Sequence, residues 1–169
     1  MLKDSSEKTL ENLKEAFAGE SQANRKYLAF AAKADTEGYA QVARLFRAAA
    51  DAETVHALAH LKAMGGINST KENVEAAVGG ETFEYKNMYP AMIEQARADV
   101  EDEAENSFTN ANAVERIHAG LYQKYLDNMS NLPAIDIYVC QVCGNTVEGN
   151  APDICPVCAS SKDKFKKIV

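Results

Sequence analysis

The sequence predicts an all-α protein: a bundle of four long helices over residues 1–134, followed by a small metal-binding module over residues 135–169. Apolar residues recur at spacings of three and four along four segments of the first part, as they do on helices that share a core. The pattern of the first half also returns in the second at an offset of 61 or 62 residues, as from Glu20 to Glu81 and from Glu53 to Glu115. All four cysteines lie within residues 140–158.

The first two helices form the first half of the repeat. Residues 4–7 (Asp-Ser-Ser-Glu) can cap the first helix, and Gly38 ends it. The second helix is expected over residues 39–64, and the two glycines that follow stop it. Their apolar stripes are Leu10, Leu13, Phe17, Tyr27, Ala31 and Ala34 on the first, and Val42, Phe46, Ala49 and Ala63 on the second.

The third and fourth helices follow a polar crossover at residues 66–73. Pro90 lies inside the third helix and is expected to kink it, because proline removes a backbone donor and clashes with the preceding turn. Residues 131–137 break the helical period and form a linker. The apolar stripes are Val74, Val78, Tyr85, Met88 and Met92 on the third helix, and Ala104, Phe108, Ala111, Tyr122, Tyr125 and Met129 on the fourth.

The repeat indicates one structural unit, a helical hairpin, used twice. Positions outside the charged residues match as well: Asn12, Ala16, Gly19, Phe46, Ala49 and Ala57 recur as Asn73, Ala77, Gly80, Phe108, Ala111 and Ala119. A site between two such hairpins would have an approximate two-fold axis, and each hairpin would supply the same ligands.

Acidic residues and histidines interrupt the apolar stripes at matching places. Each half has one lone glutamate and then Glu-x-x-His: Glu20, Glu53 and His56, then Glu81, Glu115 and His118. Charged groups in an apolar seam are costly unless they are paired or bind a metal. No Lys or Arg lies on the stripes nearby, so the set predicts the carboxylate and imidazole ligands of a di-iron site in a four-helix bundle.

The spacing also suggests a role for each ligand. A Glu-x-x-His pair places both side chains on one helix face, so we expect Glu53 and Glu115 to bridge the two metals. The remaining ligands would be terminal: Glu20, Glu81, His56 and His118.

One further carboxylate breaks the symmetry of the predicted site. Glu84 lies three residues after Glu81, and its counterpart in the first half is Ala23. A metal on that side could exchange His56 for Glu84 when its charge rises on oxidation. We therefore take Glu84 and His56 as the catalytic pair.

Other polar residues near the stripes are expected to have lesser roles. His60 and Glu94 have no partner in the repeat, so a core-edge histidine and an exposed glutamate are expected. Most of the tyrosines are expected to pack, and one or two could bond to ligand carboxylates: Tyr27, Tyr85, Tyr89 and Tyr122.

The cysteines form two Cys-x-x-Cys knuckles, Cys140 with Cys143 and Cys155 with Cys158. Four thiolates in this pattern bind one metal tetrahedrally. Spacing alone does not separate zinc, which would make a structural ribbon, from iron, which would make a one-electron carrier. The predicted di-metal site in the same chain favours iron.

Composition excludes some partners and suggests a compartment. The net charge of −7 and a pI near 5.0 argue against a nucleic-acid partner. Residues 1–4 begin no apolar signal segment, and no run approaches the ~18 apolar residues of a membrane span. We expect a cytoplasmic protein that binds neither nucleic acid nor a membrane.

Several short motifs resemble the rubrerythrin family over essentially the whole chain. They are AFAGES at 16–21, GE-x-x-EY at 80–85, MYP at 88–90, YVC-x-x-CG at 138–144 and CPVCA at 155–159. The resemblance implies a ferritin-like bundle with a rubredoxin-like module, a di-iron site that is oxo-bridged when oxidised, and one iron held by four cysteines. By it, the metal ligands are Glu20, Glu53, His56, Glu81, Glu84, Glu115, His118, Cys140, Cys143, Cys155 and Cys158.

The same resemblance implies a function. It indicates an NAD(P)H-linked peroxidase that reduces hydrogen peroxide to water in oxidative-stress defence. This chain has no glycine-rich nucleotide motif, so the electrons would come from a separate reductase, directly or through rubredoxin. Two other classes stay open: a ferroxidase or iron-storage protein, which would need no thiolate iron, and a structural protein with a zinc ribbon and inert bundle carboxylates.

The resemblance further implies a homodimer, in which the module of one subunit lies beside the di-iron site of the other. The fourth helix would be ~40 Å long at 1.5 Å per residue. With its module at the far end, the two sites of one chain would be about 20 Å apart. We therefore expect electrons to cross between subunits.

Overall fold

The computed structural model describes residues 7–169, and the predicted cap at Asp4, Ser5 and Ser6 lies outside them. The chain forms two compact units, the first ending at Asn68 and the second beginning at Ser69. The mostly helical architecture with a small C-terminal sheet agrees with the predicted fold class. None of the helices in residues 7–169 combines the length and apolar character needed to cross a bilayer.

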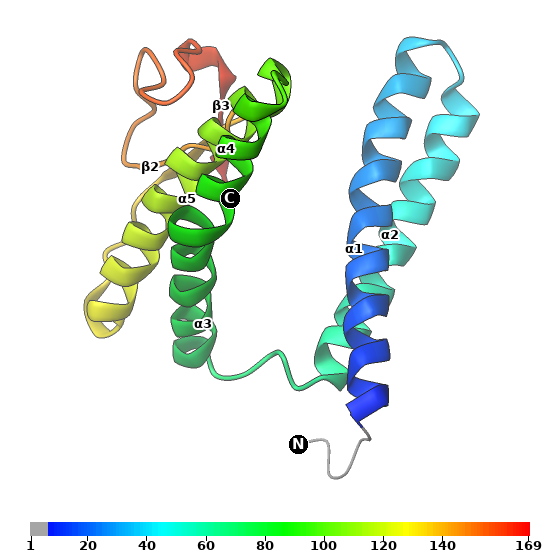
Figure 1. Ribbon diagram of the computed structural model, residues 1–169, viewed down its shortest axis with the longest axis horizontal. Coiled ribbons are helices and arrows are strands. Elements are labelled where there is room, and N and C mark those ends of the chain that lie inside the picture. The colour runs from blue at the N-terminus through cyan, green and yellow to red at the C-terminus, as the bar shows by residue number, and fades with distance from the viewer. Residues whose placement is uncertain (1–6) are drawn as a thin grey trace. The chain divides into compact units, whose positions relative to one another are not determined.

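The first unit is a hairpin of α1 (Glu7–Thr36) and α2 (Ala40–Ala63), drawn in blue and cyan in Figure 1. Small side chains let the two helices approach closely, and an aromatic group fills the space near the turn. The ring of Phe46 lies 5.6 Å from that of Phe30 and 6.0 Å from that of Tyr27. The buried alanines of this hairpin are Ala31, Ala34, Ala43, Ala50 and Ala57.

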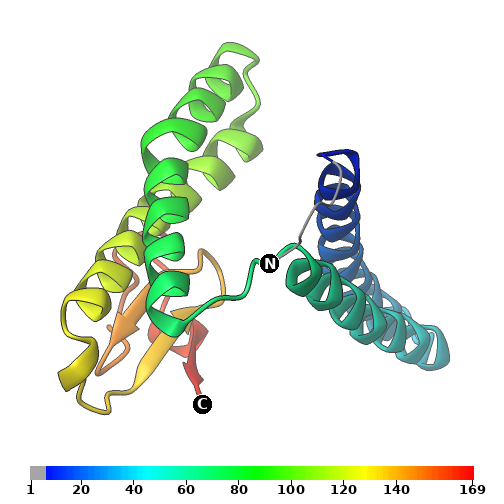
Figure 2. The same cartoon turned by 90° about the horizontal axis from the view of Figure 1, so that it is seen from below.

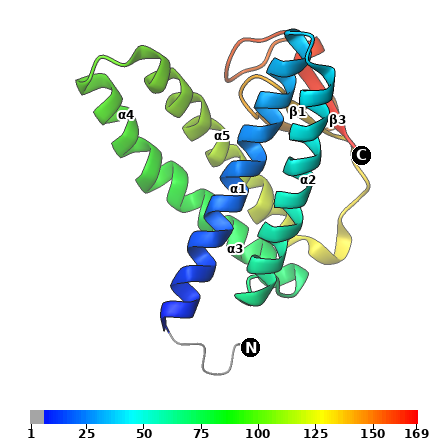
Figure 3. The ribbon, with the colours of Figure 1, turned by 90° about the vertical axis from the view of Figure 1, so that its right-hand side faces the viewer.

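The second unit begins with α3 (Thr70–Phe83), which Ser69 and Glu72 cap reciprocally. One turn of π-helix (Glu84–Met88) separates α3 from α4 (Tyr89–Ala98), and α5 (Asp102–Asp127) runs back beside them (Figure 3).

The distortion predicted at Pro90 lies in the turn before it. Pro90 itself sits in the first turn of α4, where the missing N–H is tolerated. The N–H of Tyr89 bonds to the carbonyl of Glu84, five residues back. The wider turn thus absorbs the proline, and it begins at Glu84.

The tight turns of the two hairpins match in position but not in residue. Gly38 follows α1 with φ +83°, and Val100 follows α4 with φ +60°. These residues are 62 positions apart, the offset of the Glu-x-x-His pairs. Glycine adopts this left-handed conformation freely, whereas a β-branched residue is strained in it.

The C-terminal module is a three-stranded antiparallel sheet in the order β2-β1-β3. Its strands are β1 (Ile137–Cys140), β2 (Thr146–Glu148) and β3 (Phe165–Ile168). Short 3-10 turns lie at Met129–Asn131, before β1, and at Lys162–Lys164, before β3. The sheet lies against the C-terminal half of α5 within the second unit (Figure 2). The domain boundary at 134/135 stays a prediction.

Candidate metal centres

The first hairpin brings together Glu20 from α1 with Glu53 and His56 from α2. One ligand atom of each lies within 4.8 Å of those of the others. His56 Nδ1 is 2.9 Å from Glu53 Oε2, as the i, i+3 spacing on one helix face predicts. The His56 side chain is 55% exposed and that of Glu53 is 18% exposed. The group is therefore open on its imidazole side within this unit.

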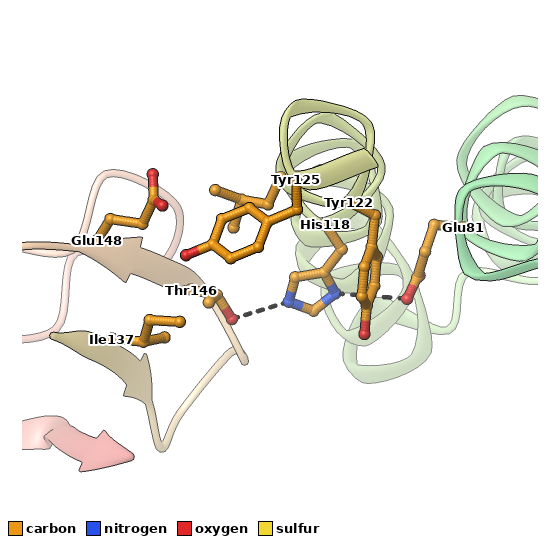
Figure 4. A pocket seen from close by; sticks show the side chains of 8 residues that line it. Glu81, His118, Tyr122, Tyr125, Ile137, Thr146 and Glu148 are labelled. Carbon is orange, nitrogen blue, oxygen red and sulfur yellow. Dashed lines mark hydrogen bonds and ion pairs between the residues drawn. The ribbon is translucent and has the colours of Figure 1, made fainter. Parts of the chain in front are cut away.

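The second hairpin forms the equivalent group from Glu81 on α3 with Glu115 and His118 on α5. His118 Nδ1 lies 2.7 Å from Glu115 Oε2. It lies 4.0 Å from Glu81 Oε1, a pair that Figure 4 shows. The His118 side chain is 25% exposed, less than half the value for His56. This imidazole is thus more enclosed than its counterpart.

Crowded carboxylates dominate the electrostatics of the second group. Burial, with the hydrogen bond and charge of Glu115, raises the pKa of Glu81 to about 7. Burial and then Glu115 also raise the pKa of Glu84, and burial followed by these carboxylates raises that of Tyr89. Facing carboxylates without a cation share protons, and a bound cation would replace those protons. Carboxylate and imidazole donors at this spacing fit iron or manganese.

Glu84, the additional predicted ligand, is not part of the three-residue group, but the charges of that group act on its pKa. It starts the π-helical turn and responds to the charges of Glu115 and His118. Its counterpart Ala23 offers no donor. Glu94 is exposed on α4, and His60 is half-buried and belongs to neither three-residue group, in line with the minor roles expected for them.

The four cysteine sulfurs of the module also converge. Cys140 Sγ lies 3.7 Å from Cys158 Sγ, and Cys143 Sγ lies 3.6 Å from Cys155 Sγ. A tetrahedron with metal–sulfur bonds of about 2.3 Å has edges of about 3.8 Å, so the sulfurs are spaced for one tetrahedral ion.

The protonation of these thiols is uneven. Burial raises the pKa of Cys143. Burial opposes ionisation of Cys158 too, but hydrogen bonding with Ser160 outweighs it and lowers the pKa of Cys158 to about 6. Asn145, which is buried, donates to Cys155 Sγ at 3.6 Å. These donors suit a charged thiolate site, for iron or for zinc.

The predicted separation of the two sites within one chain is wrong. Thr146 Oγ1 on β2 lies 2.9 Å from His118 Nε2, so the module touches the second carboxylate group directly (Figure 4). The chain reverses after the 3-10 turn at Met129–Asn131, so that the sheet returns along α5. Glu148, also on β2, pairs with Lys124 of α5.

Thr146 was not among the residues predicted from the sequence. It follows Cys143 by three residues, but a threonine in a short strand carries no signal of a distant partner. A cavity of about 270 Å³ opens beside this contact. Its walls are Glu81, His118, Leu121, Tyr122, Tyr125, Ile137, Thr146 and Glu148.

Family models match both parts of the chain. The model for rubrerythrin matches residues 11–126, and the model for the rubrerythrin rubredoxin-like domain matches residues 138–166. The two matches cover the bundle helices and the cysteine module.

Individual proteins match over nearly the whole chain. Rubrerythrin-2 of Clostridium acetobutylicum is 35% identical, over 94% of this chain and 95% of its own. Nigerythrin of Nitratidesulfovibrio vulgaris is 36% identical, over 93% of this chain and 85% of its own. A solved structure of nigerythrin in the fully reduced, all-ferrous state superposes with a TM-score of 0.59 at 33% identity, covering 98% of this chain and 89% of that one.

Proposed function

Because this chain belongs to the rubrerythrin family, we propose that it reduces hydrogen peroxide to water with electrons delivered through its four-cysteine iron centre. The family consists of di-iron proteins of oxidative-stress defence, with a rubredoxin-like iron site beside the di-iron site. An oxidoreductase role follows from that membership. The peroxide substrate and the electron route are the proposal.

One observation carries the proposal: the same three-residue donor group occurs twice, and one copy touches the cysteine module. Storage of iron would use the carboxylate groups alone. A redox cycle needs a path for electrons, and the contact between Thr146 and His118 supports a route from the module to this donor group.

We assign the ligands as the symmetry of the repeat suggests. Glu53 and Glu115 would bridge a metal pair, and the terminal ligands would be Glu20, Glu81, His56 and His118, drawn from the two three-residue groups. The thiolate site is formed by Cys140, Cys143, Cys155 and Cys158. An iron pair, when bound, supplies the two electrons that cleave the O–O bond.

The chain's own residues supply geometry and protons. Reduction of one peroxide to two waters consumes two electrons and two protons. Burial and then Glu115 raise the pKa of Glu84, so this carboxyl can hold a proton beside the site while it is not bound to metal. Glu84 also offers an anionic oxygen, which we propose exchanges with His56 as a ligand when the metal is oxidised.

The electrons come from outside the chain. We propose an NAD(P)H-dependent reductase, acting directly or through rubredoxin, that reduces the cysteine-bound iron one electron at a time. We also propose that the protein works as a homodimer or larger assembly, with a bundle domain at residues 1–134 and a rubredoxin-like domain at residues 135–169.

Replacing Cys155 separates electron supply from peroxide chemistry. In Cys155→Ser, we expect NAD(P)H-driven turnover through the reductase to be lost. A single turnover by the chemically reduced bundle should persist, because Glu81, Glu115 and their counterparts are untouched. Val157→Ala, between the two knuckle cysteines, serves as the matched control with both activities. Steady-state flux at the wild-type level in Cys155→Ser would refute the electron route.

A further inference from the structure

We propose that Thr146 is a positioning residue for the carboxylate and imidazole group in its own chain. Its hydroxyl accepts the Nε2–H of His118 and thereby fixes the imidazole with Nδ1 toward Glu81 and Glu115. This inference rests on the proposed function in one respect: it takes His118 as a metal ligand through Nδ1.

The hydrogen-bond directions follow from the contacts of Thr146. Its hydroxyl donates to the carbonyl of Gly144 at 3.1 Å, which uses its only proton. The oxygen is then an acceptor at 2.9 Å from His118 Nε2, so the ring proton must reside on Nε2. In the metal-loaded protein, a neutral imidazole protonated there would present the lone pair of Nδ1 to the ion, on the side of the carboxylates.

Thr146 is itself held by the cysteine site. It pairs with Val139 across β1 and β2, and it follows Asn145, which is 1% exposed and donates to Cys155 Sγ. The Asn145 carbonyl also accepts the N–H of Cys140 at 2.9 Å. A metal that orders the four sulfurs therefore also orders the acceptor that His118 uses. The two sites are coupled within one chain through a hydrogen bond that nothing in the first hairpin reproduces.

The first hairpin provides an internal comparison. His56 Nδ1 contacts Glu53 as His118 Nδ1 contacts Glu115, but within the described part of the chain His56 Nε2 has no hydrogen-bond partner. Among the described residues, no contact therefore holds the ring proton of His56 on Nε2, whereas Thr146 does so for His118.

The test uses the full chain loaded with Zn²⁺, which is diamagnetic and fills both kinds of site. Nitrogen-15 NMR of the three histidines reads metal coordination at Nδ1 separately from solvent exchange of the Nε2 proton. We expect Thr146→Val to speed exchange of the His118 Nε2 proton about tenfold, as loss of one hydrogen bond predicts. Thr146→Ser should restore slow exchange, and Thr109→Val, an exposed threonine on α5, should change nothing.

A second measurement asks whether the bond positions the ligand. With zinc held by the cysteines, Mn²⁺ should bind the carboxylate groups about tenfold more weakly in Thr146→Val, and Thr146→Ser should restore the affinity. Unchanged proton exchange, or unchanged Mn²⁺ affinity, in Thr146→Val would overturn the inference. A His118 Nδ1 that never shows coordination would instead remove the ligand role on which the proposed function depends.

Mixed assemblies separate contact within a chain from contact between chains. Thr146→Val chains labelled at histidine are co-refolded with unlabelled His118→Ala chains, which retain Thr146. If the bond forms within a chain, the labelled His118 keeps its fast exchange in the mixture. Recovery of slow exchange would show that Thr146 reaches the histidine of another subunit, and would overturn the assignment to one chain.

Discussion

The two hairpins carry the same donor residues but hold their histidines differently. In α1–α2, His56 is 55% exposed and its Nδ1 contacts Glu53. In α3–α5, His118 is 25% exposed, and its two ring nitrogens lie within hydrogen-bonding distance of Glu115 and Thr146. The two halves of the repeat therefore share the donor residues but differ in the exposure and contacts of the histidine. Within the described residues, the hydrogen bond at Nε2 is made by His118 only.

A second difference lies in the helix that carries the lone glutamate. The first helix, α1, is continuous through Glu20, whereas a π-helical turn beginning at Glu84 directly follows α3. That turn presents a carboxylate where the first hairpin has only Ala23. The additional oxygen donor thus lies on the hairpin whose histidine is bonded to Thr146.

The largest predicted effect compares the two histidines. His118→Ala should lower peroxide turnover by more than about a hundredfold, because it removes a ligand and the link to the module together. His56→Ala should cost about tenfold, because Glu84 can supply an oxygen in its place. Turnover with a chemical reductant, alongside a metal count for each variant, checks this. Equal losses would mean that the two sides are functionally alike.

Replacing Glu84 makes the second hairpin resemble the first. Glu84→Ala should slow turnover about ten- to a hundredfold while the protein still binds metal. Glu94→Ala, an exposed glutamate ten residues further along, is the matched control and should be near wild type. If Glu94→Ala slows turnover and Glu84→Ala does not, the additional carboxylate ligand is Glu94 on α4 and not Glu84.

The raised pKa of Glu81 predicts how metal affinity depends on pH. Burial and Glu115 hold the pKa of Glu81 at about 7 before metal binds, so below that pH the ion must displace a proton. Loss of the Glu81 proton should raise the affinity for Mn²⁺ about tenfold per pH unit up to pH 7, above which the affinity should level off. Glu81→Gln should bind more weakly and flatten that rise. Titration of Mn²⁺ by electron paramagnetic resonance measures both, and a flat wild-type profile between pH 5.5 and 7 would contradict the assignment.

These contrasts also mark what the sequence could predict. Periodicity located the helices, and the repeated Glu-x-x-His spacing picked out both three-residue groups, because residues three apart on a helix must share a face. The π-helical turn appeared only as a kink at Pro90, since periodicity does not reveal a change of pitch. The Thr146–His118 contact was missed and the sites were placed too far apart, because a chain reversal at residues 129–136 depends on packing against α5.

The smallest predicted effect concerns the turns of the hairpins. Val100 adopts φ +60° where the first hairpin uses Gly38 at φ +83°, and Val100 is 80% exposed, so its side chain contributes little packing. A left-handed conformation costs a non-glycine residue about 1–2 kcal/mol. The greater freedom of glycine in the unfolded chain offsets about 0.5–1 kcal/mol of that.

Val100→Gly should therefore stabilise the folded protein by about 0.5–1 kcal/mol, which raises the Tm by about 2 °C for a chain of this size. Gly38→Val should lower it by a similar amount, because a Cβ at that position meets no atom within 4 Å and only the backbone strain counts. The two sites lie in separate units, so the double variant should return close to the wild-type Tm. Thermal unfolding of the metal-loaded protein measures all three. If Val100→Gly lowers the Tm instead, the side chain of Val100 makes a stabilising contact in the assembled protein. That result would contradict the strain argument.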